Sequence, residues 1–225
     1  MKIKELHSWD VSPEEAVAIQ KDLRNQVKLA PLTAMPETVA GVDVSYDRGC
    51  DIFYAAVIVF TYPELEVIEK VSARDRVSFP YVPGLLSFRE GPVVLQAFGK
   101  LKNAPDVVIF DGQGIAHPRG LGIASHIGLV SGIPAVGCAK SRLCGDYIEP
   151  GMGKGENSPL ILGGKEVGMV LRTRRGIKPV FVSPGYLMDI PGSYQVVLGC
   201  CTKYRLPEPT REAHLLVNKI RIEAT

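Results

Sequence analysis

Apolar and polar residues follow one another along the chain in blocks that predict a mixed α/β protein. Residues 12–15 read SPEE, a capping-box pattern with proline at the first helical position. Apolar residues at helical spacing follow, so we expect a helix to about Lys28. Three strand-like runs come next, at 39–46, 53–62 and 65–78, and their short links favour an antiparallel meander.

The second half of the chain alternates helical and strand patterns. The expected elements are, in order, a helix that ends near Lys102, a strand at 106–111, a helix at 121–132, a strand at 133–140, a hairpin around Gly163-Gly164, a strand at 178–185 and a terminal helix that Thr210 caps. Three antiparallel strands, a helix, and then parallel strands with a crossover helix predict a mixed sheet. The first and fourth strands of such a sheet lie side by side.

Composition narrows the class of protein. The chain has 225 residues, of which 46% are hydrophobic and 22% charged, so we expect one globular domain over residues 1–225. A net charge of +2 permits a nucleic-acid partner without requiring one. No apolar run resembles a signal peptide or a membrane span, so we expect a cytoplasmic protein. We also expect it to act as a monomer. Five cysteines without a C-x-x-C pair predict reduced thiols that mostly fill the core.

Three acidic residues are expected to meet at this sheet. Asp43 lies inside the first strand, Asp111 ends the fourth, and Glu90 comes from the helix between them. Without a lysine or arginine partner, such carboxylates would repel by roughly 4 kcal/mol per close pair at an intermediate dielectric, so they would take up protons or bind a cation. Oxygen ligands favour Mg²⁺ or Mn²⁺, and this suggests metal-assisted phosphodiester hydrolysis. Taken singly, each acid has an ordinary explanation in a turn, a strand end or a solvated helix face.

Six motifs, in order along the chain, carry a resemblance to a known family. They read GVDVSY, FPYVPGLLSFREGP, FDGQGIAHPRGLGIASHIG, GCAKSRL, VSPGYLMD and PEPTREAH. These motifs resemble those of endonuclease V, the deoxyinosine-specific repair nuclease, and they extend from about the first helix to the last. The resemblance implies a ribonuclease H-like mixed sheet, with three antiparallel strands followed by parallel strands and helices on its flanks.

The same resemblance implies roles for the polar residues around the sheet. Asp43, Glu90 and Asp111 match the metal-binding acids of the family, with Mg²⁺ as the cofactor and Mn²⁺ as a substitute. His214 matches an additional active-site residue, which would orient water or a metal-bound phosphate, or transfer a proton. Lys140 matches a family lysine that would offset phosphate charge. Outside this resemblance, His214 and Lys140 are unremarkable.

Residues 80–84, PYVPG, resemble the family's wedge, the loop that enters the duplex when a base is flipped out. Its prolines stiffen the loop, and stacking on Tyr81 at ~1–3 kcal/mol per base would offset much of the cost of flipping. A backbone N–H aimed at O6 of hypoxanthine would reject adenine, and a tight wall beside C2 would reject guanine. The residues that the resemblance places at the wedge and around the base are Pro80, Tyr81, Val82, Pro83, Gly84, Leu86, Gly112, Gln113, His117, Gly122, Ile123 and Leu143. Any one of the glycines could instead serve a tight turn or helix packing.

The activity implied by the resemblance is Mg²⁺-dependent cleavage of DNA at the second phosphodiester bond 3′ to deoxyinosine, which leaves 3′-hydroxyl and 5′-phosphate ends. One alternative is an endonuclease specific for inosine in RNA. Others are a non-catalytic binder of distorted nucleic acid and a sugar-kinase-like ATPase, which the lack of a second nucleotide-binding half disfavours. A basic cluster of Arg172, Arg174, Arg175 and Lys178 either follows the phosphate backbone or forms a solvated hairpin rim.

Overall fold

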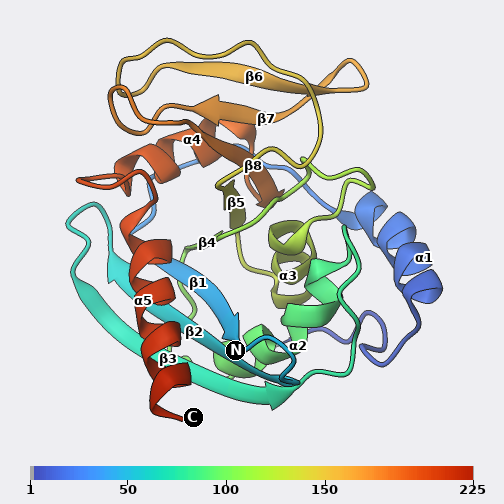
Figure 1. Cartoon of the computed structure of the whole chain (residues 1–225). Coiled ribbons are helices and arrows are strands. Elements are labelled where there is room, and N and C mark those ends of the chain that lie inside the picture. The colour runs from blue at the N-terminus through green and yellow to red at the C-terminus, as the bar shows by residue number, and fades with distance from the viewer. Residues whose placement is uncertain (1–2, 225) are drawn as a thin grey trace.

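The computed structural model describes residues 3–224 of the chain (Figure 1). The strands in this part of the chain form a single mixed sheet. Its strands are β1 (Thr38–Tyr46), β2 (Ile52–Thr61), β3 (Val67–Arg76), β4 (Val107–Phe110), β5 (Ala135–Ala139), β6 (Asn157–Leu162), β7 (Lys165–Leu171) and β8 (Val180–Tyr186). They lie in the order β3-β2-β1-β4-β5-β8-β7-β6. β1 pairs parallel with β4, and β4 with β5, whereas the other neighbours are antiparallel. The expected α/β mixed sheet, with its first and fourth strands adjacent, is confirmed.

Helices flank the sheet in the positions that the apolar spacing predicts. They are α1 (Pro13–Leu23), α2 (Leu86–Phe98), α3 (Ile123–Ser131), α4 (Ile190–Gly199) and α5 (Glu208–Glu223), with a 3-10 turn at Arg24–Gln26. The capping box of α1 is complete, because the Ser12 side chain accepts from the Glu15 N–H and the Glu15 carboxylate accepts from the Ser12 N–H.

Several helix boundaries differ from the predicted ones. α1 ends at Leu23 and tightens into a 3-10 turn before Lys28, and α2 stops at Phe98, ahead of Lys102. Thr210 does not cap α5, since it lies inside the first turn and its hydroxyl donates to the Pro207 carbonyl. α4 was not predicted, although Asp189 is its N-cap and accepts from an N–H of the first turn.

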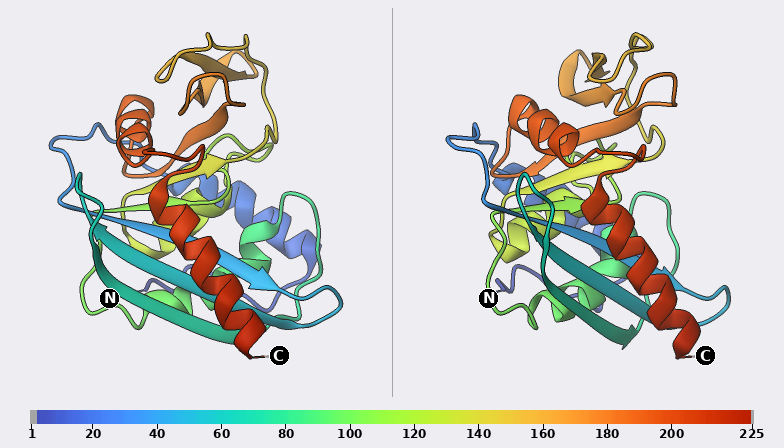
Figure 2. Two further views of the ribbon diagram at one scale, coloured as in Figure 1. Left: turned by 60° about the vertical axis from the view of Figure 1, so that its left-hand side comes forward. Right: turned by 90° about the vertical axis from the view of Figure 1, so that its left-hand side faces the viewer.

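Helices cover both faces of the sheet (Figure 2). The two largest apolar clusters lie on these opposite faces. Alternate residues of β1 divide between them: Ala40 and Val42 pack with α2 and α3, whereas Val39 packs on the side of α4 and α5. Cys138, Cys200 and Cys201 are buried in the second core, as expected for thiols that fill space, and all five cysteines are free. Within residues 3–224, no helix combines the length and the apolar character needed to cross a membrane.

The functional region begins where the β1–β4 pairing stops. The parallel register ends at Val42 opposite Phe110, while β1 continues to Tyr46 with β2 alone as its partner. Asp43 and Asp111 are the next residue on each strand, so both follow directly after a ladder that fixes their backbones. The end of β4 therefore leaves a notch in the sheet beside β1.

Helix α5 crosses β1 and β2 at very short range, and this contact depends on Gly41. A Cβ at residue 41 would lie 2.0 Å from the carbonyl carbon and oxygen of Pro209, in the first turn of α5. Backbone atoms cannot move out of the way as a flexible side chain can. The contact therefore sets how closely α5 approaches β1, and with it the position of any α5 side chain that faces the notch.

We expect Gly41→Ala to lower the free energy of unfolding by about 1–3 kcal/mol, because the methyl group forces β1 and α5 apart. Gly99→Ala is the matched control: its φ is −60° and the nearest carbonyl oxygen would lie 3.4 Å from the new Cβ. Chemical denaturation of both variants measures the difference. Equal stability of the two variants would contradict the close-contact argument.

Candidate active site

The notch holds carboxylates from three elements. Asp43 extends from β1 on the face covered by α5, Asp111 follows β4, and Glu90 comes from the middle of α2. Each of the three is close enough to the others to shift a pKa, since Asp111 raises the pKa of Asp43, and both raise that of Glu90. We call these three residues the acidic cluster.

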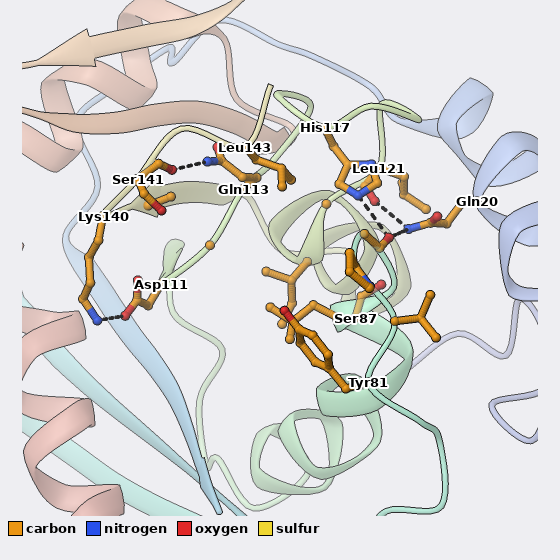
Figure 3. A pocket seen from close by; sticks show the side chains of 18 residues that line it. Gln20, Tyr81, Ser87, Asp111, Gln113, His117, Leu121, Lys140, Ser141 and Leu143 are labelled. Atoms are coloured by element: carbon orange, nitrogen blue, oxygen red, sulfur yellow. Dashed lines mark hydrogen bonds and ion pairs between the residues drawn. The ribbon is translucent and has the colours of Figure 1, made fainter. Parts of the chain in front are cut away.

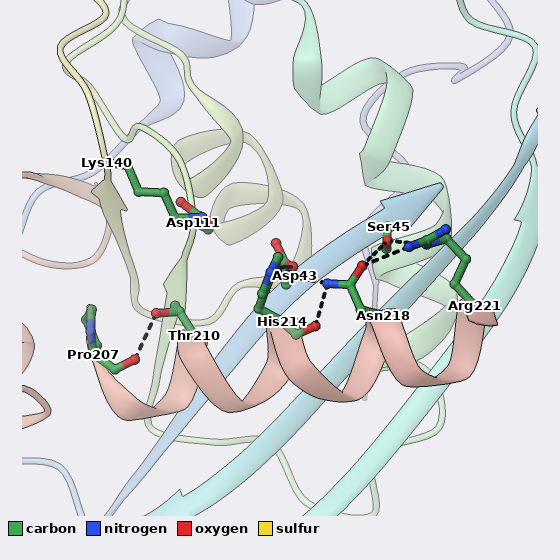
Figure 4. Close-up of polar contacts among 9 residues, drawn as sticks. All are labelled: Asp43, Ser45, Asp111, Lys140, Pro207, Thr210, His214, Asn218 and Arg221. Atoms are coloured by element: carbon green, nitrogen blue, oxygen red, sulfur yellow. Dashed lines mark hydrogen bonds and ion pairs between the residues drawn. The ribbon is translucent and has the colours of Figure 1, made fainter. Parts of the chain in front are cut away.

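Asp43 is held by a histidine from α5 (Figure 4). The Nδ1 atom of His214 lies 2.7 Å from Oδ2 of Asp43, and the Asp43 side chain is only 13% exposed. Burial raises the pKa of Asp43, the hydrogen bond with His214 lowers it, and the negative charge of Asp111 raises it again. His214 therefore lies in direct contact with the acidic cluster; its side chain is about half exposed, and its Nε2 lies 3.2 Å from Nδ2 of Asn218.

Asp111 has a basic partner, contrary to the prediction that none of the three acids is paired with a lysine or arginine. Lys140, directly after β5, forms an ion pair with Asp111 through its ammonium group. The Lys140 side chain is about half exposed, so the pair faces solvent at the edge of the notch. An exposed ion pair of this kind is weak, because water screens it and the long side chain gives up rotamer freedom to form it. Lys140 can thus exchange Asp111 for another anion, such as a phosphate.

Glu90 is the most strongly perturbed of the acids. Burial raises the pKa of Glu90 to about 8, and the charges of Asp43 and Asp111 add to this effect. A carboxylate placed this way holds a proton near neutral pH unless a positive charge comes close.

The acidic cluster fits a hard divalent cation. It offers oxygen donors only, and the negative charges of Asp43 and Asp111 raise the pKa of Glu90, so a bound cation would relieve that repulsion. Among residues 3–224, no three His, Cys, Asp or Glu side chains are already gathered tightly around one point. Asp43 turns to His214 and Asp111 to Lys140, so binding a cation would require these side chains to rotate toward it.

A polar network behind His214 connects it to β1 (Figure 4). Asn218, one turn further along α5, donates to the His214 carbonyl at 2.8 Å, and its Oδ1 accepts from the Ser45 hydroxyl at 2.8 Å. Ser45 lies two residues after Asp43, on the same face of β1. This bond ties α5 to the strand that carries Asp43. Nothing in the sequence pattern distinguishes Asn218 from any other polar helix residue.

A pocket of about 350 Å³ opens beside the acidic cluster (Figure 3). Three separate segments form its walls: residues 81–87, 111–123 and 139–143, together with Gln20 from α1. Asp111 and Lys140 belong to its lining, so the pocket and the acidic cluster are continuous. The size is within the usual range for a small-molecule site.

The pocket brings together most of the residues that the family resemblance places around a base. Of those twelve, eleven line it, and Pro80 is the exception. Tyr81 is 66% exposed beside the pocket, as an aromatic ring that contacts a partner would be. Gly112 and Gly122 line the pocket and also pack closely: a Cβ at Gly122 would lie 2.3 Å from the Gln113 carbonyl oxygen. Both glycines are therefore needed for close packing, independently of any ligand in the pocket.

The polar side chains of the pocket are directed mainly at the protein itself. Gln113 donates from its amide nitrogen to the Ser141 carbonyl at 3.2 Å, which joins two walls, and its buried Oε1 has no partner among the described residues. The imidazole of His117 bonds the Gly84 carbonyl and the Arg119 N–H. Burial, with the charge of Arg119, lowers the pKa of His117 to about 4, so the ring is neutral near pH 7.

The expected basic cluster is only partly at the surface. Arg172 is 3% exposed and donates to the carbonyls of Pro150, Gly151 and Ile177, and it pairs with Glu149. It therefore stabilises the loop ahead of β6 and cannot follow a phosphate backbone. The other three members, Arg174, Arg175 and Lys178, are exposed.

Known proteins share this fold and sequence. A model of the Endonuclease V family matches residues 21–215. An endonuclease V of Myxococcus xanthus is 48% identical over 218 residues, which cover 96% of this chain and 93% of that protein. The crystal structure of an endonuclease V from Streptomyces avermitilis has a TM-score of 0.92 at 42% identity and covers 100% of this chain and 99% of its own. One from Ciona intestinalis, in complex with a 23mer DNA containing an inosine followed by a ribo-adenosine, has a TM-score of 0.84 at 27% identity, with 96% and 100% covered.

The raised pKa of Glu90 predicts how stability depends on pH. Because its folded pKa of about 8 exceeds the ordinary 4.5, the native state keeps a proton that the unfolded state has released. The free energy of unfolding should then fall as pH rises from 4.5 toward 8, by at most ~1.4 kcal/mol per pH unit. Glu90→Gln removes this loss, so its stability advantage over wild type should grow across that range in urea titrations with a chelator present.

Glu64→Gln, which changes an exposed carboxylate, is the matched control and should follow the wild-type pH profile. A constant difference between Glu90→Gln and wild type from pH 5 to pH 8 would show that Glu90 is not perturbed.

Proposed function

Because the chain belongs to the endonuclease V family, we propose that this endonuclease recognises deoxyinosine in DNA and hydrolyses the second phosphodiester bond 3′ to it, with Mg²⁺ as cofactor. The products would carry 3′-hydroxyl and 5′-phosphate ends. Mn²⁺ would substitute for Mg²⁺, since both are hard ions that accept oxygen ligands. We further infer that residues 1–225 act as one domain and as a monomer.

The continuity of the pocket with the acidic cluster carries this proposal. A flipped base in the pocket would leave its own backbone close to Asp111 and Lys140, which line the same cavity. Base recognition and backbone cleavage need such neighbouring sites. Either feature alone would suit a binding protein, whereas the two together favour a nuclease that acts beside a recognised base.

The acidic cluster and the two residues that contact it, Lys140 and His214, each have a role in the proposed chemistry. Asp43, Glu90 and Asp111 would hold the metal ion, which when bound supplies a water of lowered pKa and stabilises the leaving oxygen. Lys140 would leave Asp111 for the phosphate and offset its charge. His214 would orient water or a metal-bound phosphate, or transfer a proton at Nε2, the ring nitrogen that does not face Asp43.

The proposed selectivity rests on the walls of the pocket. Hypoxanthine presents an acceptor at O6 and a hydrogen at C2, whereas adenine presents an amino donor at C6 and guanine an amino group at C2. A main-chain N–H beside O6 and a close wall beside C2 discriminate against both. Gly84, Gly112 and Gly122 line the pocket and let the backbone approach a base without an intervening Cβ.

The wedge loop, residues 80–84, would separate the flipped base from its former neighbours. Tyr81 is the exposed aromatic residue of this loop, and it lies beside the pocket. Stacking of a base on an aromatic ring is worth ~1–3 kcal/mol, which offsets part of the few kcal/mol that flipping costs.

Asp43→Asn and Asp111→Asn test the acidic cluster. Each should reduce cleavage of a labelled duplex with one hypoxanthine by at least about 100-fold in Mg²⁺, since loss of a ligand exceeds the 10–100-fold effect of losing a group behind one. Binding of the same duplex in Ca²⁺ should remain. Asp22→Asn, an exposed carboxylate on α1, is the control and should cut normally. Normal cutting by both site variants would remove the metal assignment.

The sugar of the substrate is a separate question, because inosine-containing RNA offers the same base. We expect faster cleavage of a DNA strand with one deoxyinosine than of the RNA strand of matched sequence with one inosine, measured by gel assay in Mg²⁺. A DNA strand with adenine at that position serves as the control for selectivity. Preference for the RNA strand would replace the proposed substrate with inosine in RNA and leave the pocket and the acidic cluster in their roles.

A further inference from the structure

Gln20 lies outside the acidic cluster and outside all six motifs, yet it is the only part of α1 that lines the pocket among the described residues (Figure 3). It is 1% exposed, although it is a polar residue on a helix that carries charged residues on its outer side. We propose that Gln20 is a positioning residue that fixes the wedge loop for entry into duplex nucleic acid. This inference rests on the proposed function.

The hydrogen bonds of the Gly84 carbonyl are the first observation. This oxygen ends the wedge loop and accepts from three side chains: Gln20 Nε2 at 2.9 Å, His117 Nε2 at 3.1 Å and an Arg119 guanidinium nitrogen at 2.7 Å. We call these three donors and the carbonyl the Gly84 cluster. A peptide oxygen has two lone pairs and usually accepts one or two bonds, so three donors are an unusual concentration on a loop.

Gln20 connects the wedge loop with a second wall of the pocket. Its Nε2 also donates to the Leu121 carbonyl at 3.1 Å, just before α3, and its Oε1 accepts from Nε of Arg119. One amide group therefore bonds to Gly84, Leu121 and Arg119 at once. α1, the wedge loop and the segment before α3 meet at this side chain.

The His117 tautomer agrees with this arrangement. Nδ1 of His117 accepts from the Arg119 N–H at 3.1 Å, so the ring hydrogen is on Nε2 and is donated to the Gly84 carbonyl. The backbone at Gly84 has a φ of +80°, and a Cβ there would lie 2.5 Å from the Arg119 guanidinium. Only glycine allows the carbonyl to turn toward its three donors in this way.

The other end of the wedge loop is also fixed, but by different contacts. Arg89 donates to the Phe79 carbonyl at 2.9 Å, and Val82 packs on the apolar cluster that contains Phe79 and Phe88. Tyr81 is thus the exposed tip of a loop held at both ends. A mobile wedge loop would have to be ordered when it enters the duplex, at a cost in conformational entropy. A loop that is already ordered before binding does not add this cost to the flipping step.

The experiment compares two substrates that differ in the need for a wedge. A duplex with one deoxyinosine must be opened to extrude the base, whereas the same strand alone offers it without a partner strand. Gln20→Met keeps the side-chain length and removes both donors and the acceptor. We expect the ratio of kcat/KM on the duplex to kcat/KM on the single strand to fall about tenfold or more relative to wild type, as for a small displacement of a reacting geometry.

Two further variants keep the result interpretable. Gln26→Met makes the same change at an exposed position after α1 and should behave as wild type on both substrates. Gln20→Glu keeps the acceptor for Arg119 but removes both donors, and should show the duplex-selective loss. Tyr81→Ala should show it as well, because it removes the tip that Gln20 holds in place. Thermal unfolding of each variant identifies any that fail to fold. If Gln20→Met fails to fold, Arg119→Met takes its place, because it removes another donor to the Gly84 carbonyl.

Equal losses on duplex and single strand, or no loss on either, would overturn the positioning role. Hydrogen exchange provides a readout that does not need activity. The Leu85 N–H, which bonds the Val82 carbonyl at 2.9 Å, should exchange faster in Gln20→Met than in Gln26→Met. If wild type cuts neither substrate, the proposed function is wrong, while the exchange rates still decide whether Gln20 holds the loop.

Discussion

The parallel pairing of β1 with β4, which stops at Val42 and Phe110, is the constraint on which the site depends. Hydrogen bonds of the ladder fix both backbones up to that point, so Asp43 and Asp111 cannot move apart to relieve their repulsion. Burial makes the repulsion stronger than it would be in water, and Glu90 adds a third acid to the same volume. The energy to hold them together comes from the two apolar cores, whose side chains pack against the same strands. A different interaction reduces the repulsion at each acid: Asp43 bonds His214, Asp111 pairs with Lys140, and the raised pKa of Glu90 favours its protonated form.

The pocket is built on a different physical basis from the acidic cluster. Its walls come from segments far apart in the chain, and they are joined through backbone carbonyls rather than through charge pairs: Gly84 and Leu121 by Gln20, and Ser141 by Gln113. Neutral hydrogen bonds of this kind depend little on pH or salt, whereas the acidic cluster responds to both. The proposed base pocket would thus keep its shape while a bound cation or phosphate changes the charge next to it.

The sequence predicts what arises from local pattern and strand order, and it fails where a side chain acts across the fold. Apolar alternation and short links place β1 beside β4, and the closeness of Asp43 and Asp111 follows from that. The same methods miss α4, because this helix has only 10 residues and shows no clear apolar periodicity. They misplace Thr210, because a threonine near the start of a helix resembles an N-cap residue. Arg172 looks like any surface arginine in a basic run, but its guanidinium donates to three carbonyls, and two of these, Pro150 and Gly151, belong to a different loop of the chain. Family resemblance names Lys140, yet only the structure shows its pairing with Asp111.

Gln20 shows most clearly why such residues escape a sequence pattern, and why few replacements would serve. The position needs two donors on one nitrogen, for Gly84 and Leu121, and an acceptor beside it for Arg119. Glutamate lacks the donors, lysine lacks the acceptor, methionine lacks both, and asparagine is shorter by one methylene. Arg119 is equally specific, because a planar guanidinium donates to Gln20 from Nε and to Gly84 from a terminal nitrogen, and it holds these two nitrogens at a fixed spacing that the single nitrogen of an ammonium group does not provide. The identity of both residues is therefore determined by carbonyl oxygens that the linear sequence does not display, and the requirement becomes visible only when α1 is seen against the wedge loop.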